Sequence, residues 1–111
     1  MVFSLQINST MGAVDIAVSG LGTSMNDAFR RLQHESNEQD GIDAYSGGFN
    51  TIIEYHDLTA EWQASGQEAA AFLEDEERMD VLDKREANAV CLRAPTSQQE
   101  GEYLFVGWGA E

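Results

Sequence analysis

The chain has 111 residues, of which 42% are hydrophobic, and this predicts one folded domain spanning residues 1–111. Its single cysteine, Cys91, excludes an internal disulfide and a multi-cysteine zinc site. Twenty acidic and six basic residues give a net charge of −14, which disfavours direct binding to nucleic acid or to an anionic membrane.

Nothing in the sequence predicts insertion into a membrane or secretion. No stretch approaches the roughly 18 apolar residues that a membrane-spanning helix needs. The first eight residues lack the basic start and the long apolar run of a secretory signal. We therefore expect the protein in the cytoplasm.

The negative charge is concentrated in the middle of the chain. Residues 1–34 have no net charge, residues 35–86 carry −12 (fifteen acids, three bases), and residues 87–111 carry −2. This asymmetry predicts that the middle of the chain attracts basic partners, and that it associates with them fastest at low salt. Lys84 is the only lysine, and many acids with so little lysine are also typical of salt-adapted proteins. That alternative predicts acids over the whole surface.

Two strands and a helix are expected in the first third of the chain. Apolar and polar residues alternate over residues 2–7 and again over 14–18, which predicts two strands paired antiparallel across a turn at residues 8–10. Residues 20–22 should end the second strand. A helix should follow, capped by Thr23 or Ser24, and Ser24 with Asp27 resembles a capping box. This helix should end before Gly41 and has one apolar stripe formed by Met25, Ala28, Phe29 and Leu32.

The remaining elements follow from β-forming runs and one capping signal. Residues 49–55 are rich in β-formers and predict a third strand, whose extension toward Trp62 is ambiguous. Ser65 with Glu68 resembles a capping box, so a second helix is expected over residues 67–79. Residues 87–93 and 103–108 predict two further strands, the last apolar enough to be central or covered on both faces.

The order ββαβαββ predicts an α+β fold. The simplest arrangement is two-layered, with a four- to five-stranded, mainly antiparallel sheet and two helices packed on one face.

Two groups of motifs resemble small, uncharacterised bacteriophage and prophage proteins. In those proteins a helix with Ala-Phe leads to a Tyr-Ser-Gly-Thr-Ile loop, and the chain ends near a Tyr-Leu-Phe-Phe-Gly-Trp strand. The residues of the first group are Asp27, Ala28, Phe29, Arg30, Tyr45, Ser46, Gly47, Thr51 and Ile52. Those of the second group are Asp83, Lys84, Ala89, Val90, Cys91, Leu92, Tyr103, Leu104, Phe105, Val106, Gly107, Trp108 and Gly109. Gly48, Phe49 and Asn50 interrupt the loop motif. Before the last two strands those proteins have a Lys-Trp-Gly-Pro-Ala stretch, and here Arg85 with Glu86 follows Lys84 in place of Trp-Gly. The resemblance implies a viral or mobile-element origin, in a host cytoplasm, but no activity.

The candidate partner-binding residues are carboxylates on and around the second helix. They are Glu68, Glu74, Asp75, Glu76, Glu77, Asp80 and Asp83. A folded array of carboxylates can imitate the charge of duplex DNA, which has one charge per ~1.7 Å of axis, and so attract proteins that bind DNA. The alternative is a solvated helix face. Tyr45 and Phe49 lie in a glycine-rich loop, where exposed aromatic side chains can anchor an interface.

Catalytic and metal-binding alternatives have weaker support. His34 with Glu38 and His56 with Asp57 could contribute to a metal site, but their spacing does not define one. Cys91 lies in an apolar strand, and Ser46 lacks a Gly-x-Ser-x-Gly turn. Residues 20–24 lack the full glycine pattern and the lysine of a phosphate-binding loop. We therefore expect no catalytic residue, metal or cofactor.

The function that the sequence favours is a non-enzymatic one. A phage-type acidic protein would bind a basic, nucleic-acid-binding host protein and inhibit it, as an anti-defence protein, an anti-CRISPR or a DNA mimic does. The alternatives are a phage structural or assembly protein, a salt-adapted domain, and a small hydrolase or metal enzyme. A homodimer is left open.

Overall fold

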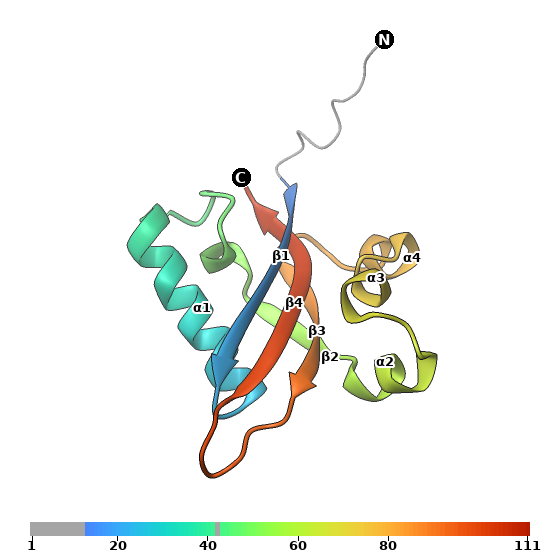
Figure 1. The fold of residues 1–111 in the computed structure, drawn as a ribbon. Coiled ribbons are helices and arrows are strands. Elements are labelled where there is room, and N and C mark those ends of the chain that lie inside the picture. Colours follow the sequence, from blue (N-terminus) through green and yellow to red (C-terminus); the bar gives the residue numbers. More distant parts are fainter. Residues whose placement is uncertain (1–12, 42) are drawn as a thin grey trace.

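The computed structural model describes residues 13–41 and 43–111 (Figure 1). The described part contains four strands, four α-helices and one 3-10 helix. In chain order they are β1 (Ala13–Gly22), α1 (Met25–Asp40), η2 (Phe49–Thr51), β2 (Glu54–Asp57), α2 (Thr59–Ser65), α3 (Ala69–Leu73), α4 (Glu76–Asp80), β3 (Glu86–Arg93) and β4 (Gly101–Ala110). The α+β class is confirmed. The strand expected at residues 2–7 and its turn lie outside the described residues.

The sheet is mixed rather than antiparallel throughout. Its strand order is β1-β4-β3-β2, and β4 pairs antiparallel with both β1 and β3. The short edge strand β2 runs parallel to β3. A parallel pair needs a long crossover between its strands, and the segment with α2, α3 and α4 provides it.

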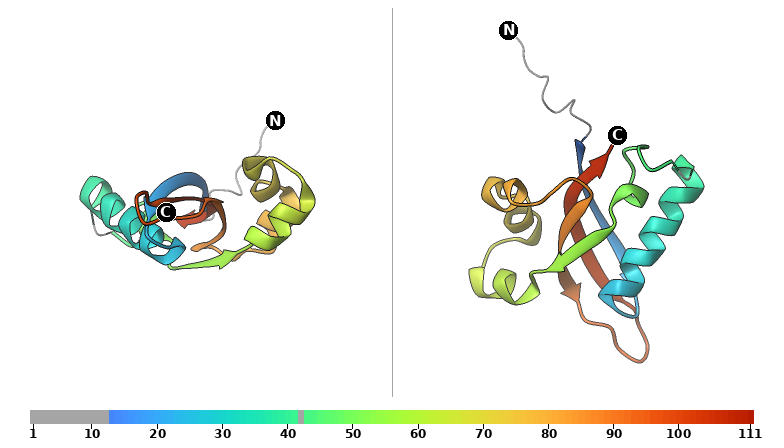
Figure 2. Two further views of the ribbon diagram at one scale, coloured as in Figure 1. Left: turned by 60° about the horizontal axis from the view of Figure 1, so that its bottom comes forward. Right: turned by 180° about the vertical axis from the view of Figure 1, so that it is seen from behind.

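Helices cover both faces of the sheet, so the two-layer arrangement with both helices on one face is wrong. Figure 2 shows α1 and η2 on one side and α2, α3 and α4 on the other. The reason is the apolar character of β3 and β4, whose residues are buried on both faces. The expectation that the last strand is central is confirmed.

The sheet separates two hydrophobic clusters. The aromatic cluster, on the α1 side, is built on Phe29, Phe49 and Phe105, whose ring centroids lie 5.4–5.7 Å apart. The opposite cluster joins Val90 and Val106 of the sheet to residues of the α2–α4 segment, by which we mean the connection between β2 and β3 that contains α2, α3 and α4. These residues are Ala69, Phe72, Leu73, Met79 and Leu82.

The helix α1 begins and ends as expected. The Ser24 hydroxyl accepts a hydrogen bond from the Asp27 amide, and Gly41 follows the helix with a φ of 79°. The end predicted for β1 at residues 20–22 is wrong, because these residues pair with Tyr103, Glu102 and Gly101. Glycine is required at Gly22, where a Cβ atom would lie 2.6 Å from the Ala28 backbone nitrogen.

The helix expected at residues 67–79 is instead two short helices. Glu68 caps α3, and the Asp75 carboxylate accepts a hydrogen bond from the Arg78 amide and caps α4. Asp75 is extended (φ −55°, ψ 133°), which interrupts the helix. Residues 59–65, left ambiguous by the sequence, form α2. Ser65 is the last residue of α2, so the Ser65–Glu68 capping box does not form.

The strand expected at residues 49–55 is shorter and later than predicted. The 3-10 helix η2 occupies its first half, and β2 begins only at Glu54. Thr51 in η2 is fully buried, and its hydroxyl donates to the Gly48 carbonyl (2.7 Å) and accepts from the Ala110 amide (2.9 Å). This residue therefore ties the connection before β2 to the end of β4.

No helix in the described part of the chain combines the length and the apolar character needed to cross a membrane.

Replacing Thr51 with valine should lower the free energy of unfolding by about 1–3 kcal/mol, because the buried Ala110 amide loses its partner. Urea denaturation measures the change. Thr51→Ser keeps the hydroxyl, so it should lower the free energy of unfolding less than Thr51→Val does. A valine variant as stable as the wild type would contradict the role assigned to this hydrogen bond.

Asp27 predicts a pH dependence at the start of α1. Its hydrogen bond from the Thr23 amide lowers the pKa of the carboxyl, as does the nearby Arg31, while desolvation opposes them. A lowered pKa means that the ionised carboxylate stabilises the fold above the ordinary value of 3.8, and that this stabilisation is lost as pH falls through the lower, folded value. Asp27→Asn should therefore be less stable than the wild type at neutral pH, with a gap that closes on acidification. A gap independent of pH would contradict this assignment.

Candidate functional site

The acidic residues singled out from the sequence lie around α3 and α4, but they are not equivalent. Glu68 and Asp75 are helix caps, so their carboxylates are partly committed to backbone amides. Glu74, Glu76, Glu77, Asp80 and Asp83 are exposed. Because α3 and α4 have five residues each, the acids do not follow one continuous helix.

The cation nearest to these acids in sequence has partners of its own. The guanidinium of Arg78 lies 3.5 Å from the Asp75 carboxylate and 3.6 Å from the centre of the Phe72 ring. It packs down onto the helix pair and leaves the carboxylates of α4 with little neutralisation. Residues 58–84 together hold eight acids and two bases.

A groove of about 630 Å³ lies between this acidic segment and the outer edge of the sheet. Its lining combines an apolar floor with carboxylates. The apolar floor is formed by Ala17, Met79, Val106 and Trp108, and the acidic residues are Asp15, Glu74, Glu76 and Asp80. Ile16 also borders the groove, but it packs against the aromatic cluster on the other face of the sheet. We call it the acidic groove.

The register of the sheet builds one wall of the acidic groove. Asp15 lies opposite Trp108, and Ala17 lies opposite Val106. The helices α3 and α4 pack over β4 and β3 but leave Asp15 and Ala17 of β1 exposed. The indole Nε1 of Trp108 donates to the Met79 carbonyl (2.9 Å), which fixes α4 against β4 at the base of the groove.

Sequence reasoning identified three of the groove's acids, Glu74, Glu76 and Asp80, and missed its sheet side. The alternation in β1 placed Asp15 and Ala17 on the polar face of a strand, but only the β1–β4 register brings that face beside α4.

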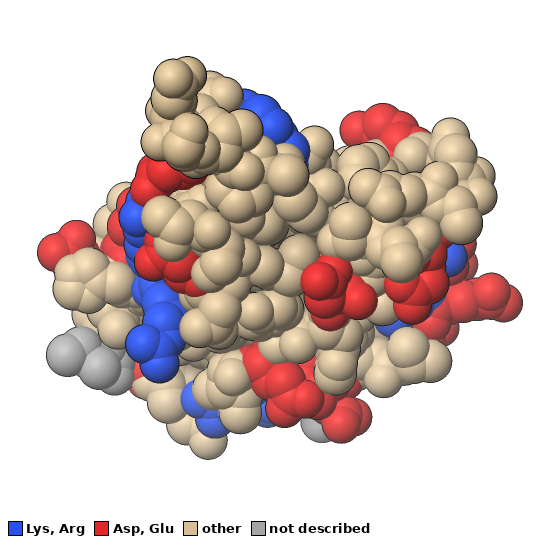
Figure 3. Space-filling view, turned by 90° about the horizontal axis from the view of Figure 1, so that it is seen from below, with Lys and Arg blue, Asp and Glu red and all other residues tan. Residues whose placement is uncertain are grey.

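The fold divides the acidic middle of the chain between opposite sides of the molecule. Glu35 and Glu38 lie on α1, across the sheet from α3 and α4. Figure 3 shows acidic side chains in several separate groups on the face seen from below, with basic side chains prominent on the α1 side. The acidic residues that are concentrated in the middle of the sequence therefore do not form a single patch on this face.

The two aromatic candidates differ in exposure. Tyr45 is 61% exposed, in the turn after α1. Phe49 is 6% exposed and packs in the aromatic cluster. The expectation that its side chain is exposed is therefore wrong. The insertion of Phe49 in the loop motif thus serves the core.

The residues considered as a nucleophile or as a phosphate-binding loop have structural roles instead. Burial raises the pKa of the Cys91 thiol, which disfavours the reactive thiolate. The Ser46 hydroxyl donates to Asn50 Oδ1 (2.9 Å) inside a turn. At the start of α1 the Asp27 carboxylate accepts a hydrogen bond from the Thr23 amide (2.9 Å), and the Ser24 hydroxyl accepts one from the Asp27 amide (3.0 Å), so side chains of the chain itself cap this turn.

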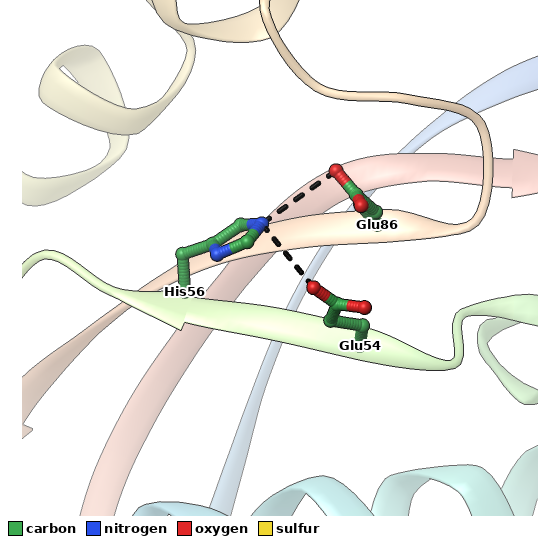
Figure 4. Close-up of side chains that lie close together, drawn as sticks. All are labelled: Glu54, His56 and Glu86. Atoms are coloured by element: carbon green, nitrogen blue, oxygen red, sulfur yellow. Dashed lines mark ion pairs between the residues drawn. The ribbon is translucent and has the colours of Figure 1, made fainter.

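The two histidines lie in different elements, and only one of them has several carboxylate neighbours. His34 pairs with Glu38 on α1, with 3.5 Å between Nε2 and Oε2. His56 on β2 has its Nε2 atom 3.5 Å from Glu86 Oε1 and 3.9 Å from Glu54 Oε2 (Figure 4). Asp57 follows His56 in the sequence and was a candidate to share a metal site with it. Its carboxylate instead accepts hydrogen bonds from the amide and the hydroxyl of Thr59.

No family model matches the sequence, and neither a curated protein nor a solved structure matches it. The function of the chain must therefore be inferred from its own residues.

Replacing Trp108 with phenylalanine should lower the free energy of unfolding by about 1–2 kcal/mol, because the Met79 carbonyl loses its donor in a partly buried position. Trp62→Phe is a matched control, since Trp62 Nε1 donates to the Gln67 carbonyl at the same distance, 2.9 Å, but in an exposed position. The loss in free energy of unfolding, measured by urea denaturation, should be smaller for Trp62→Phe than for Trp108→Phe. Equal losses would show that the Trp108 bond does not hold α4 in place.

Proposed function

We propose that this protein is a non-enzymatic binding protein that holds a basic segment of a partner in the acidic groove. The observation that supports this proposal is the combination in one groove of the apolar floor at Trp108 and Val106 with the carboxylates of Glu74, Glu76 and Asp80. Ligand sites commonly join an apolar floor to a few polar groups that orient the ligand.

The chemistry of the groove suits lysine and arginine side chains. Their aliphatic stems can lie on apolar surface while the charged group stays at the rim. Hydrogen bonds between such cations and carboxylates are about twice as strong as bonds between neutral groups. The indole of Trp108 adds a surface on which a cation can stack.

Proteins that bind nucleic acid present basic surfaces of this kind. The net charge of −14 would speed the encounter with them at low salt. We propose that the partner is a nucleic-acid-binding protein of the host cell, inhibited because the groove and the acids of α3 and α4 occupy its basic surface. The viral origin implied by the sequence motifs is part of this proposal.

A salt-adapted domain is the second candidate, and the distribution of charge favours it. Acids occur on both sides of the sheet and in separate groups on the face of Figure 3. Acids that only hold water would need no groove and no partner. A structural or assembly role in a phage particle would require self-association, which light scattering detects.

Charge reversal in the groove should separate binding from general acidity. Glu74→Lys with Glu76→Lys should weaken binding to the basic partner by about tenfold or more at low salt, mainly through slower association. Asp75 should be kept, because it caps α4. The matched control is Glu35→Lys with Glu38→Lys on α1, which changes the net charge equally and should leave most of the affinity.

The partner for this test is isolated on the wild-type protein from host lysate at low salt and eluted with duplex DNA. Isothermal titration then gives the affinity of each variant. Equal weakening by both pairs of substitutions would contradict a groove-specific site. Capture of no basic protein, together with a melting temperature that rises steeply with salt, would favour the salt-adapted candidate.

A further inference from the structure

Glu54, His56 and Glu86 form a second cluster, separate from the acidic groove. Their ligand atoms lie within 4.8 Å of one another. The cluster is at the β2 edge of the sheet, whereas the groove is at the β1 edge. Figure 4 shows the imidazole of His56 pointing toward both carboxylates.

The sheet fixes the relative positions of the three side chains. Tyr55 packs into the aromatic cluster, so Glu54 and His56, its neighbours on β2, face the opposite side. Glu54 lies opposite Glu86 in the parallel β2–β3 pair. A hydrogen bond from the Ile53 amide to the Arg85 carbonyl (2.9 Å) holds the two strands together beside this pair.

We propose that Glu54, His56 and Glu86 bind a divalent transition-metal ion of the Zn²⁺ class. In a tetrahedral site with bonds of about 2.1 Å, ligand atoms lie about 3.4 Å apart. The imidazole Nε2 is 3.5 Å from Glu86 Oε1 and 3.9 Å from Glu54 Oε2, and all three ligand atoms lie within 4.8 Å of one another. Rotation of the exposed Glu54 side chain would bring them closer to that spacing.

The charges of the cluster match such an ion. Two carboxylates and a neutral imidazole carry a charge of −2, which a divalent cation neutralises while relieving the repulsion between the carboxylates. Carboxylate oxygens alone suit Mg²⁺ and Ca²⁺, but the imidazole nitrogen favours Zn²⁺ and its neighbours in the first transition row.

The surroundings of the cluster resemble an open metal site. Glu86 Oε1 accepts a hydrogen bond from the Asp83 amide (3.2 Å), and such outer contacts orient metal-binding carboxylates. The side chains of Glu54 and His56 are 56% and 44% exposed, so water can supply the remaining ligands. A bound ion would link the four-residue edge strand β2 to β3.

Titration of the metal-free protein with ZnCl₂ tests the proposal. We expect one ion per chain, with an affinity reduced by about tenfold or more in His56→Gln and in Glu86→Gln. His34→Gln is the matched control, because His34 has a single carboxylate partner, and should bind as the wild type does. Equal affinity in the wild type and His56→Gln would overturn the proposal, as would displacement of Zn²⁺ by millimolar Mg²⁺.

Nuclear magnetic resonance of the unmodified protein keeps the test decisive if a variant fails to fold. The chain has two histidines, so each imidazole signal can be assigned with His34→Gln. Zn²⁺ should shift the His56 signals and leave those of His34 in place. Equal shifts of both, or none, would show that the cluster is only a set of ion pairs.

Discussion

The burial of β4 on both faces is the constraint on which the rest of the structure depends. Phe105 contributes to the aromatic cluster and Val106 to the opposite cluster, so consecutive residues of one strand belong to different cores. Close pairing with β3 also requires Gly107, where a Cβ atom would collide with the Glu86 carbonyl. A strand of this kind needs helices on both sides, and α1 and the α2–α4 segment provide them.

This arrangement leaves the two edges of the sheet, as described, with different chemistry. At β1, the helices α3 and α4 stop short of the strand and leave the acidic groove. At β2, the parallel register places a histidine and two glutamates on one face. The acidic composition contributes to both, but in different ways: the groove suits an extended cationic segment, and the cluster suits a single small ion.

The sequence predicted those features that depend on local signals. The cap at Ser24, the end of α1 at Gly41 and the strands around Val90 and Phe105 follow from residue types and their spacing. Features that depend on register could not be predicted. Glu54 and His56 alternate as residues of one strand face do, but Glu86 lies 30 or more positions away and joins them only through the parallel pairing. In the sequence Asp75 is one acid among several, and its role as a helix cap depends on its backbone conformation.

The division of the core by the sheet also means that the two halves of the protein differ in local stability. On one side, aromatic rings pack against the sixteen-residue helix α1. On the other, short helices of five to seven residues cover the opposite cluster. Regions with few long-range contacts open with less free energy than the rest of a protein. The helices α3 and α4, which form one wall of the acidic groove, are therefore expected to open with less free energy than the aromatic side.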